Sequence, residues 1–320
     1  MFNPDLRLNP NWSTDPPQAT RDGFGAALID LVNQKPELIV LTADLADSLR
    51  LETFKQTHPD KFLDLGIAEQ NMIGVAAGLA AEGFIPISTS YGVFSPGRNW
   101  DQIRVQLGYS QLNVKIVSSH LGLVTGPDGA VHQGLEDIAL SRVIPNLTVV
   151  CPVDYYQAIK ATRDIVYHSG PVYVRLSRPN IPSITTPQTP YSLGQAQILR
   201  FGTSVSIVAT GTMVAEALKA AEEIDAEVIN VHTIKPLDIN TIIQSLKKTG
   251  KLMVVEEHQI AGGLGSAVLE SLVEAGTFPP QIKLMGVNDQ FGQSGTPEEL
   301  LDAYGLTWHH IITTYNQFEI

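Results

Sequence analysis

The chain has 320 residues, of which 43% are hydrophobic and 17% are charged, and its formal net charge is −12. This is the composition of an ordinary globular protein, and the length predicts two domains that can each bury a core. The excess of acidic residues argues against nucleic acid or an anionic membrane surface as a partner, because no basic stripe is available to neutralise phosphates.

The chain contains one cysteine, Cys151, which excludes an internal disulfide and a paired-cysteine metal site. It lies in the apolar run LTVVCP, so we expect a core thiol rather than a reactive one. The N-terminal residues contain no apolar signal segment. The weakly polar run 71–81 is too short to cross a membrane. We therefore expect a cytoplasmic location.

Residues 1–18 are rich in Pro and Asn and are expected to form an extended N-terminal arm. From Arg21 onwards, short apolar runs alternate with segments of helical spacing, such as 23–33 and 155–168. The runs expected as strands are LIVLT (38–42), FLDLG (62–66), FIPIST (84–89), VKIVSS (114–119), LTVVC (147–151) and VYVRL (172–176). This alternation predicts a mostly parallel sheet with helices on both faces.

A second α/β unit is expected after residues 179–195, which hold four prolines and no charged residue. Its strands are expected at 204–210, 227–232, 251–257 and 282–287. The predicted fold class is therefore α/β with two domains, each a mostly parallel sheet with flanking helices. The expected boundaries are an arm at 1–18, a first domain at 19–182, a linker at 183–195 and a second domain at 196–320.

The strongest local signal is LGIAEQNMIGVAAGLAAEG, residues 65–83. A strand should end near Gly66, and a helix should follow over about 68–81. Small residues at helical spacing, including Gly74 and Gly78, would let another backbone approach, and we expect this helix to be buried nearly all round. Glu69 lies in its first turn, where a buried carboxylate needs a partner. The helix dipole with nearby amides, or a functional role, could each explain it.

Further polar and aromatic residues follow the ends of the next predicted strands. Tyr91 and Phe94 flank a turn, His120 ends a strand, and Asp128 and His132 lie in the glycine-rich loop that comes next. Each has an ordinary structural explanation when it is taken alone. Because the carboxyl ends of parallel strands meet at one edge of a sheet, the set as a whole favours a ligand site there.

These motifs give the chain a resemblance to a known family. The segment 21–178 resembles the pyrimidine-binding domain of transketolases, and 195–320, with EEHQIAGGLGSAV at 256–268, resembles the transketolase C-terminal domain. The resemblance covers nearly the whole chain, with several motifs in order. The GGLG string by itself is a weak signal, and we expect it to open a helix without binding phosphate.

The resemblance implies thiamin diphosphate as the cofactor. Glu69 would be catalytic, because its carboxyl would contact a ring nitrogen of the aminopyrimidine and favour the imino tautomer that activates the cofactor. Tyr91 and Phe94 match the aromatic positions that stack on the pyrimidine ring. Asp44, in ADLADS, matches an acid near the cofactor. A third aromatic residue of the family pattern is absent, since Gly97 stands at its position.

The resemblance also implies a sugar-phosphate site. The matching positions are Arg21, Ser48, His120, Asp128, His132 and Arg178. The two arginines would clamp the phosphate, and the serine and His132 would add hydrogen bonds. His120 would lie closer to the reacting carbon, as a second catalytic residue, and Asp128 would read the configuration of the ketose hydroxyls.

The implied reaction transfers a two-carbon ketol unit from a ketose phosphate to an aldose phosphate, in the pentose phosphate pathway or a specialised sugar pathway. The family's GDG motif for the diphosphate is absent from this sequence. We therefore expect a split enzyme, in which an N-terminal subunit with that motif holds the diphosphate and Mg²⁺ (or Ca²⁺), in an α2β2 assembly. No metal ligand is assigned to this chain. Gly74 and Gly78 could lie at the subunit interface, or pack within one chain.

Three alternatives are kept open. The beta subunit of a 2-oxo-acid dehydrogenase shares the expected fold and the glutamate, but it has no reason to carry the phosphate-binding set. Part of a 1-deoxyxylulose-5-phosphate synthase-like enzyme would also fit the string IAEQ. A relative of another class, which binds a partner without catalysis, has no reason to retain Glu69 together with the phosphate-binding set.

Overall fold

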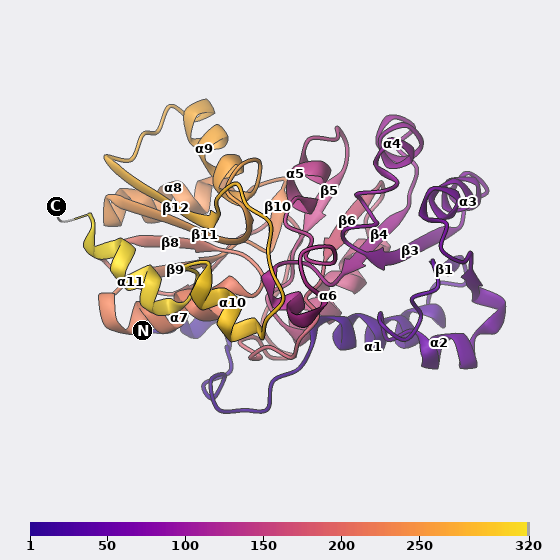
Figure 1. Cartoon of the computed structure of the whole chain (residues 1–320), viewed down its shortest axis with the longest axis horizontal. Coiled ribbons are helices and arrows are strands. Elements are labelled where there is room, and N and C mark those ends of the chain that lie inside the picture. Colours follow the sequence, from indigo (N-terminus) through magenta and orange to yellow (C-terminus); the bar gives the residue numbers. More distant parts are fainter. Residues whose placement is uncertain (319–320) are drawn as a thin grey trace.

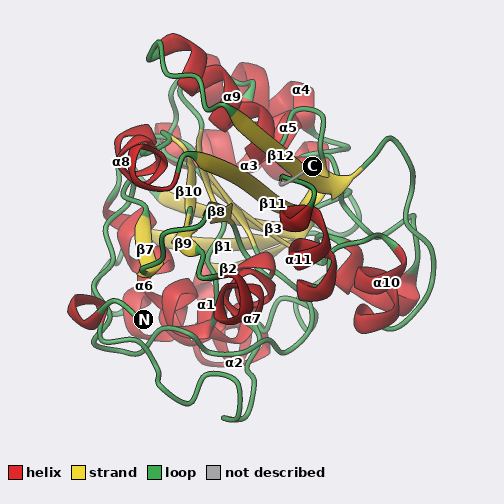
Figure 2. Cartoon of the chain, turned by 90° about the vertical axis from the view of Figure 1, so that its left-hand side faces the viewer, coloured by secondary structure: helices red, strands yellow, loops and turns green. Residues whose placement is uncertain are grey.

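The computed structural model describes residues 1–318 and contains two sheets, each covered by helices on both faces (Figure 1, Figure 2). The predicted α/β class with two mostly parallel sheets is confirmed. In Figure 1 the indigo N-terminal segment starts beside the orange and yellow part of the molecule, which is formed by the second half of the chain. It then runs below that part to α1 (Thr20–Val32).

The first sheet contains β1 (Leu38–Thr42), β2 (Phe62–Asp64), β3 (Ile85–Tyr91), β4 (Lys115–Ser119), β5 (Thr148–Val150), β6 (Val172–Arg175) and β10 (Thr233–Lys235). The helices of this part are α1 (Thr20–Val32), α2 (Glu52–Thr57), α3 (Glu69–Ala81), α4 (Trp100–Gln102), the π-helix η3 (Ile103–Tyr109), α5 (Asp137–Arg142) and α6 (Tyr155–Tyr167). Short 3₁₀ turns are η1 (Pro4–Leu6), η2 (Pro59–Lys61) and η4 (Leu123–Asp128).

The second sheet contains β7 (Gln197–Arg200), β8 (Ser206–Ala209), β9 (Glu227–Asn230), β11 (Lys251–Gln259) and β12 (Gln281–Val287). Its helices are α7 (Met213–Ile224), α8 (Ile239–Thr249), α9 (Leu264–Glu274), α10 (Pro297–Ala303) and α11 (Trp308–Asn316).

The strand order is β10-β5-β6-β4-β3-β1-β2 in the first sheet and β12-β11-β8-β9-β7 in the second. The pairings are parallel except for β10 with β5 and β7 with β9. All ten predicted strands are present, whereas β7 and β10 were not predicted. β10 comes from the second half of the chain but completes the edge of the first sheet, so the two halves share a sheet.

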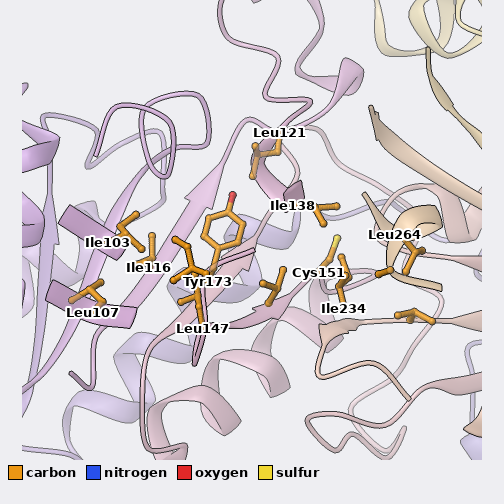
Figure 3. Close-up of a cluster of buried hydrophobic side chains, with 14 of the residues drawn as sticks. Ile103, Leu107, Ile116, Leu121, Ile138, Leu147, Cys151, Tyr173, Ile234 and Leu264 are labelled. Atoms are coloured by element: carbon orange, nitrogen blue, oxygen red, sulfur yellow. The ribbon is translucent and has the colours of Figure 1, made fainter. Parts of the chain in front are cut away.

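The hydrophobic core is continuous between the two sheets. One cluster of buried side chains extends from α3 and η3, through β4, β5 and β6, to α8 and α9. Figure 3 shows part of this cluster, with Ile116 and Tyr173 towards one end of the view, Cys151 and Ile234 in the middle and Leu264 towards the other end. The prediction of a core thiol at Cys151 is confirmed, since it is free and buried.

The N-terminal arm is packed against the rest of the chain. Phe2 forms an antiparallel bridge with Arg200, Gln18 forms another with Ile181, and Trp12 is buried. The arm therefore ties the segment around Ile181 and the second sheet to the start of α1.

The predicted helix at 68–81 is confirmed as α3, with Ala68 as its N-cap. Its expected burial all round is wrong, because Gly78 is exposed and Gly74 is only half-buried. A Cβ added at Gly78 would meet no atom within 4 Å, and one at Gly74 would meet only the Gln106 side chain, at 3.9 Å. Within residues 1–318, no backbone packs closely on this face.

Candidate active site at the carboxyl edge of the first sheet

The predicted site residues follow the carboxyl ends of the parallel strands, as the sequence pattern required. Tyr91 is the last residue of β3, and His120 comes directly after β4 with a left-handed φ of 58°. Arg178 follows β6, Ser48 follows β1, and Glu69 begins the helix after β2.

Four rings pack together at this edge. The Tyr91 and His120 rings stack with centroids 3.9 Å apart, and the Phe94 ring lies 6.0 Å from that of Tyr91 at an angle of only 19°. The His132 ring meets Tyr91 and Phe94 edge-on, at 6.0 and 5.8 Å. The Tyr91 hydroxyl lies 2.8 Å from Ser48 Oγ. The residues predicted for cofactor and for substrate are therefore in direct contact.

Arginine side chains converge on the same place. Arg21 Nη1 donates to the Ser48 carbonyl at 2.8 Å, and Arg178 Nη1 donates to the Thr125 carbonyl at 2.9 Å. Arg178 Nη2 also lies 3.8 Å from Asp128 Oδ1. Burial lowers the pKa of Arg21, and the neighbouring positive charge of Arg50 lowers it further. A concentration of positive charge of this kind suits an anionic ligand.

His120 is held as a neutral imidazole. Burial, followed by the positive charges of Arg21 and Arg178, lowers its pKa to about 3. Its Nδ1 lies 2.8 Å from Ser119 Oγ. A neutral ring has a nitrogen lone pair that can accept a hydrogen bond near pH 7, which an imidazolium lacks.

Three buried polar atoms around this cluster have no hydrogen-bond partner in the described structure: Arg21 Nε, Thr125 Oγ1 and His132 Nδ1. Native proteins rarely leave such atoms unsatisfied. Their position beside the arginines fits a site whose polar ligand completes the hydrogen bonding.

Glu69 is 1% exposed, and its Oε2 accepts a hydrogen bond from Arg98 Nη1 at 2.7 Å. The Arg98 guanidinium carbon also lies 4.5 Å from the centre of the Phe94 ring. The predicted activating carboxylate is thus joined to the predicted aromatic platform by an arginine that the sequence pattern did not assign to the site. These residues fit the pyrimidine half of thiamin diphosphate, which needs an acid beside an aromatic face.

The missing third aromatic residue has a steric explanation. A Cβ at Gly97 would lie 2.2 Å from the Val93 carbonyl oxygen, so the backbone turn admits only glycine there. Arg98, the next residue, supplies the side chain that covers Phe94. Its position four residues after Phe94, directly after this glycine, is the sequence signal that could have identified it.

Asp44 follows β1 but, within residues 1–318, forms no hydrogen bond or ion pair with this cluster. It is exposed, has a left-handed φ of 61°, and its backbone N–H donates to Asp64 Oδ1 at 3.0 Å. In the described part of the chain its carboxylate makes no hydrogen bond to the other predicted site residues.

Arg50 is, after Arg98, a second residue near the site that the sequence analysis did not identify. Its positive charge acts on Arg21, and its Nε donates to Asp22 Oδ1 at 2.7 Å.

The GGLG string opens α9, as predicted, with Gly263 as the N-cap. The Leu264 and Gly265 amides donate to the Glu256 carboxylate, at 2.6 and 2.8 Å. Among residues 1–318, the side chains of His, Cys, Asp and Glu form no group of three or more suited to a metal ion. The same part of the chain contains no helix long and apolar enough to span a bilayer.

Comparisons with known proteins agree with this arrangement. Residues 16–183 match the family described as the transketolase pyrimidine binding domain, and residues 194–311 match the transketolase C-terminal domain. A Methanocaldococcus jannaschii protein named as a transketolase C-terminal section is 43% identical over 294 residues, covering 89% of this chain and 92% of that protein. A 6-deoxy-6-sulfo-D-fructose transketolase subunit from a Clostridium species is 40% identical, covering 96% and 94%.

A solved structure shows the same similarity. A split-gene transketolase, described as an inactive tetramer of four beta subunits, superposes with a TM-score of 0.86 at 41% identity, covering 94% of this chain and 98% of that one. The fold, the site and the similarity along the chain lead to one conclusion. The chain belongs to the thiamin-diphosphate-dependent transketolase family, and it corresponds to the C-terminal section of a split transketolase.

Proposed function

We propose that this chain works with a separate N-terminal subunit to transfer a two-carbon ketol unit from a ketose phosphate to an aldose phosphate in the cytoplasm. The single observation that carries the proposal is the convergence of Arg21, Arg178 and a neutral His120 on the ring cluster beside Glu69. An anion-binding group and a cofactor-activating acid then flank one reaction centre. Thiamin diphosphate, when bound, would supply the electron sink for the carbon–carbon bond that breaks.

The cofactor side of the site would use three residues. Tyr91 and Phe94 offer ring faces to the pyrimidine, and the buried Glu69 carboxyl would hold a proton at a ring nitrogen. Burial suits this role, because a hydrogen bond in a low-dielectric setting is electrostatically stronger than one in water. Asp44, which lies at the exposed start of the loop after β1, is proposed only as a neighbour of the cofactor.

The substrate side would use the remaining predicted residues. The guanidinium groups of Arg21 and Arg178 would bind the phosphate, with Ser48 and His132 adding hydrogen bonds. His120 would contact the sugar hydroxyl next to the bond that breaks, or assist the movement of a proton there. The Asp128 carboxylate, 3.8 Å from Arg178, would accept hydrogen bonds from the hydroxyls that distinguish one ketose from another.

The N-terminal subunit would hold the diphosphate and Mg²⁺ (or Ca²⁺) in an α2β2 assembly. The name of the M. jannaschii relative, a C-terminal section, supports such a division. So does the description of the solved tetramer of beta subunits as inactive. The open face of α3 at Gly74 and Gly78 offers a surface where a second backbone can approach closely.

A ketol-transfer assay tests the proposal. Xylulose 5-phosphate and ribose 5-phosphate are supplied with thiamin diphosphate and Mg²⁺, to this chain alone and to its mixture with the N-terminal subunit. Activity only in the mixture is the expected result. Activity of the chain alone would contradict the divided site. An assembled complex that condenses pyruvate with glyceraldehyde 3-phosphate instead would contradict the ketol-transfer reaction.

A further inference from the structure

The glycine-rich loop 120–134 carries His120, Asp128 and His132, which are half of the proposed substrate-binding set. A parallel bridge between Leu121 and Gly134 closes its base. The loop belongs to the first domain by sequence, yet much of what holds its backbone comes from the second half of the chain.

Glu257, near the end of β11, makes the central contact. Its side chain is 2% exposed, its Oε1 accepts a hydrogen bond from the Val124 backbone N–H at 2.5 Å, and its Oε2 accepts one from Thr212 Oγ1 at 2.5 Å. The loop lies directly against this carboxyl group, because a Cβ at Gly122 would come within 2.4 Å of its carboxyl carbon. Gly122 also has a positive φ of 82°, so glycine is required there for two reasons.

The second contact comes from the segment before α10. Gln133 Nε2, inside the loop, donates to the Gln293 carbonyl at 2.9 Å and to the Gly126 carbonyl at 3.2 Å. A Cβ at Gly129 would lie 2.7 Å from Ser294 Oγ. The loop is therefore held between the end of β11 and residues 292–297, both of which follow the linker.

The backbone of Glu257 is held to the first sheet by Arg175, which also forms a buried ion pair with Asp137. Arg175 Nη2, at the end of β6, donates to the Glu257 carbonyl at 2.8 Å, and Arg175 Nε lies 3.1 Å from Asp137 Oδ2. The strand that carries Glu257 is thus locked to the sheet whose edge forms the active site. The carboxyl group has little freedom to move away from Val124.

We propose that Glu257 is a positioning residue, through which the C-terminal domain holds the sugar-recognition loop 120–134 in its binding geometry. The inference rests on the proposed ketol-transfer function, and it gives the C-terminal domain a part in substrate recognition. Glu257 itself touches neither substrate nor cofactor; it acts through the Val124 backbone and the loop that follows. Small displacements of groups that orient a substrate have large effects on binding and rate.

The neighbouring Glu256 provides a matched control. It is equally buried and lies on the same strand, but its carboxyl group accepts from the Leu264 and Gly265 amides at the start of α9, within the C-terminal domain. Replacing either glutamate with alanine removes a buried carboxyl group from β11. Only the replacement at Glu257 releases the substrate loop.

The experiment compares Glu257→Ala, Glu257→Gln and Glu256→Ala. Hydrogen exchange of the peptide 121–134 is measured in the chain alone, and KM and kcat are measured in the assembled enzyme. Glu257→Ala is expected to speed exchange in this peptide and to raise the KM for the ketose phosphate about tenfold, with a smaller change in kcat. Glu257→Gln should stay near the wild type, because its amide oxygen can accept from Val124 while its NH₂ donates to a reoriented Thr212 hydroxyl.

Glu256→Ala should lower the melting temperature while leaving both the KM and the exchange of residues 121–134 unchanged. A folded Glu257→Ala with wild-type exchange and KM would overturn the inference, and so would an equal effect from Glu256→Ala. If Glu257→Ala does not fold, Thr212→Val replaces it as the test. Loss of the Thr212 hydroxyl, which donates to the Glu257 carboxyl group, should also speed hydrogen exchange in the loop. Unchanged exchange in Thr212→Val would overturn the proposal. An inactive wild-type complex would count against the proposed function, while the exchange data would still test the positioning role.

Discussion

Arg98 Nη1 lies 2.7 Å from Glu69 Oε2, and this contact joins a half-exposed arginine to a carboxylate that is 1% exposed. The arginine also covers the Phe94 ring. The acid proposed to activate the cofactor is therefore already paired, with a side chain that can turn towards solvent. For Glu69 to reach a ring nitrogen, Arg98 has to share the carboxylate or leave it.

Arg98→Met tests how much this pair stabilises the chain. The methionine stem can still pack on Phe94, but the buried carboxylate loses its charged partner. We expect a loss of about 1–3 kcal/mol in the free energy of unfolding of the isolated chain, measured by urea denaturation. Arg104→Met, at an exposed position of η3, is the control. Equal stability of the two variants would mean that the pair contributes nothing to folding.

Glu69→Gln tests the activating acid. The amide oxygen can still accept the hydrogen bond from Arg98, so the melting temperature should change little. Turnover of the assembled enzyme should fall by about 10²- to 10⁴-fold, because an amide can form hydrogen bonds but cannot give a proton to, or take one from, the pyrimidine nitrogen of the cofactor. Glu82→Gln, at the exposed C-cap of α3, should keep normal turnover. Near-normal turnover of Glu69→Gln would show that the activating acid is another residue.

Arg178→Ala tests whether Arg178 binds the substrate phosphate or only holds the loop 120–134 in place. Loss of a charge-assisted contact should raise the KM for phosphorylated sugars by about 10- to 100-fold, with a much smaller effect on unphosphorylated ones. Arg178 also donates to the Thr125 carbonyl at 2.9 Å, so a purely structural role would raise the KM for both kinds of sugar alike. Arg163→Ala, which removes a surface pair with Asp30, is the control.

The sequence predicted most of the fold because most strands of the two sheets are short apolar runs, typical of strands buried on both faces. It missed β10, since three residues give no periodic signal and their burial depends on pairing with β5. It also misjudged α3. Glycine and alanine were counted with the apolar residues of that helix, although Gly78 has no neighbour on its open side.

The candidate site was predicted only in part, because local sequence shows which residues follow strand ends but not which distant residues are in contact. Residues that follow strand ends, such as Tyr91 and His120, gather at one sheet edge by topology alone. The contacts between Arg98 and Glu69, and between Glu257 and Val124, join residues 29 and 133 positions apart in the chain. No local spacing reports such pairs, and only the three-dimensional structure brings them together.

The pH dependence of stability provides a test that needs no substrate. Burial raises the pKa of Glu256 from 4.5 to about 7, although the Leu264 and Gly265 amides donate to it. Because the folded-state pKa lies above the unfolded value, the folded chain holds an extra proton between these values. The stability from this group is therefore complete below pH 4.5 and is lost as the pH rises through about 7.

Glu256→Gln cannot ionise, so it should lose less stability than the wild type when the pH rises from about 5 to 8, by a difference on the order of 3 kcal/mol. Glu257 and Glu136 also have raised pKa values because of burial, but they are present in both proteins and cancel in the comparison. Glu274→Gln, at the exposed end of α9, should follow the wild type. Parallel curves for wild type and Glu256→Gln, from urea denaturation at each pH, would show that Glu256 is already ionised at pH 5 in the folded chain.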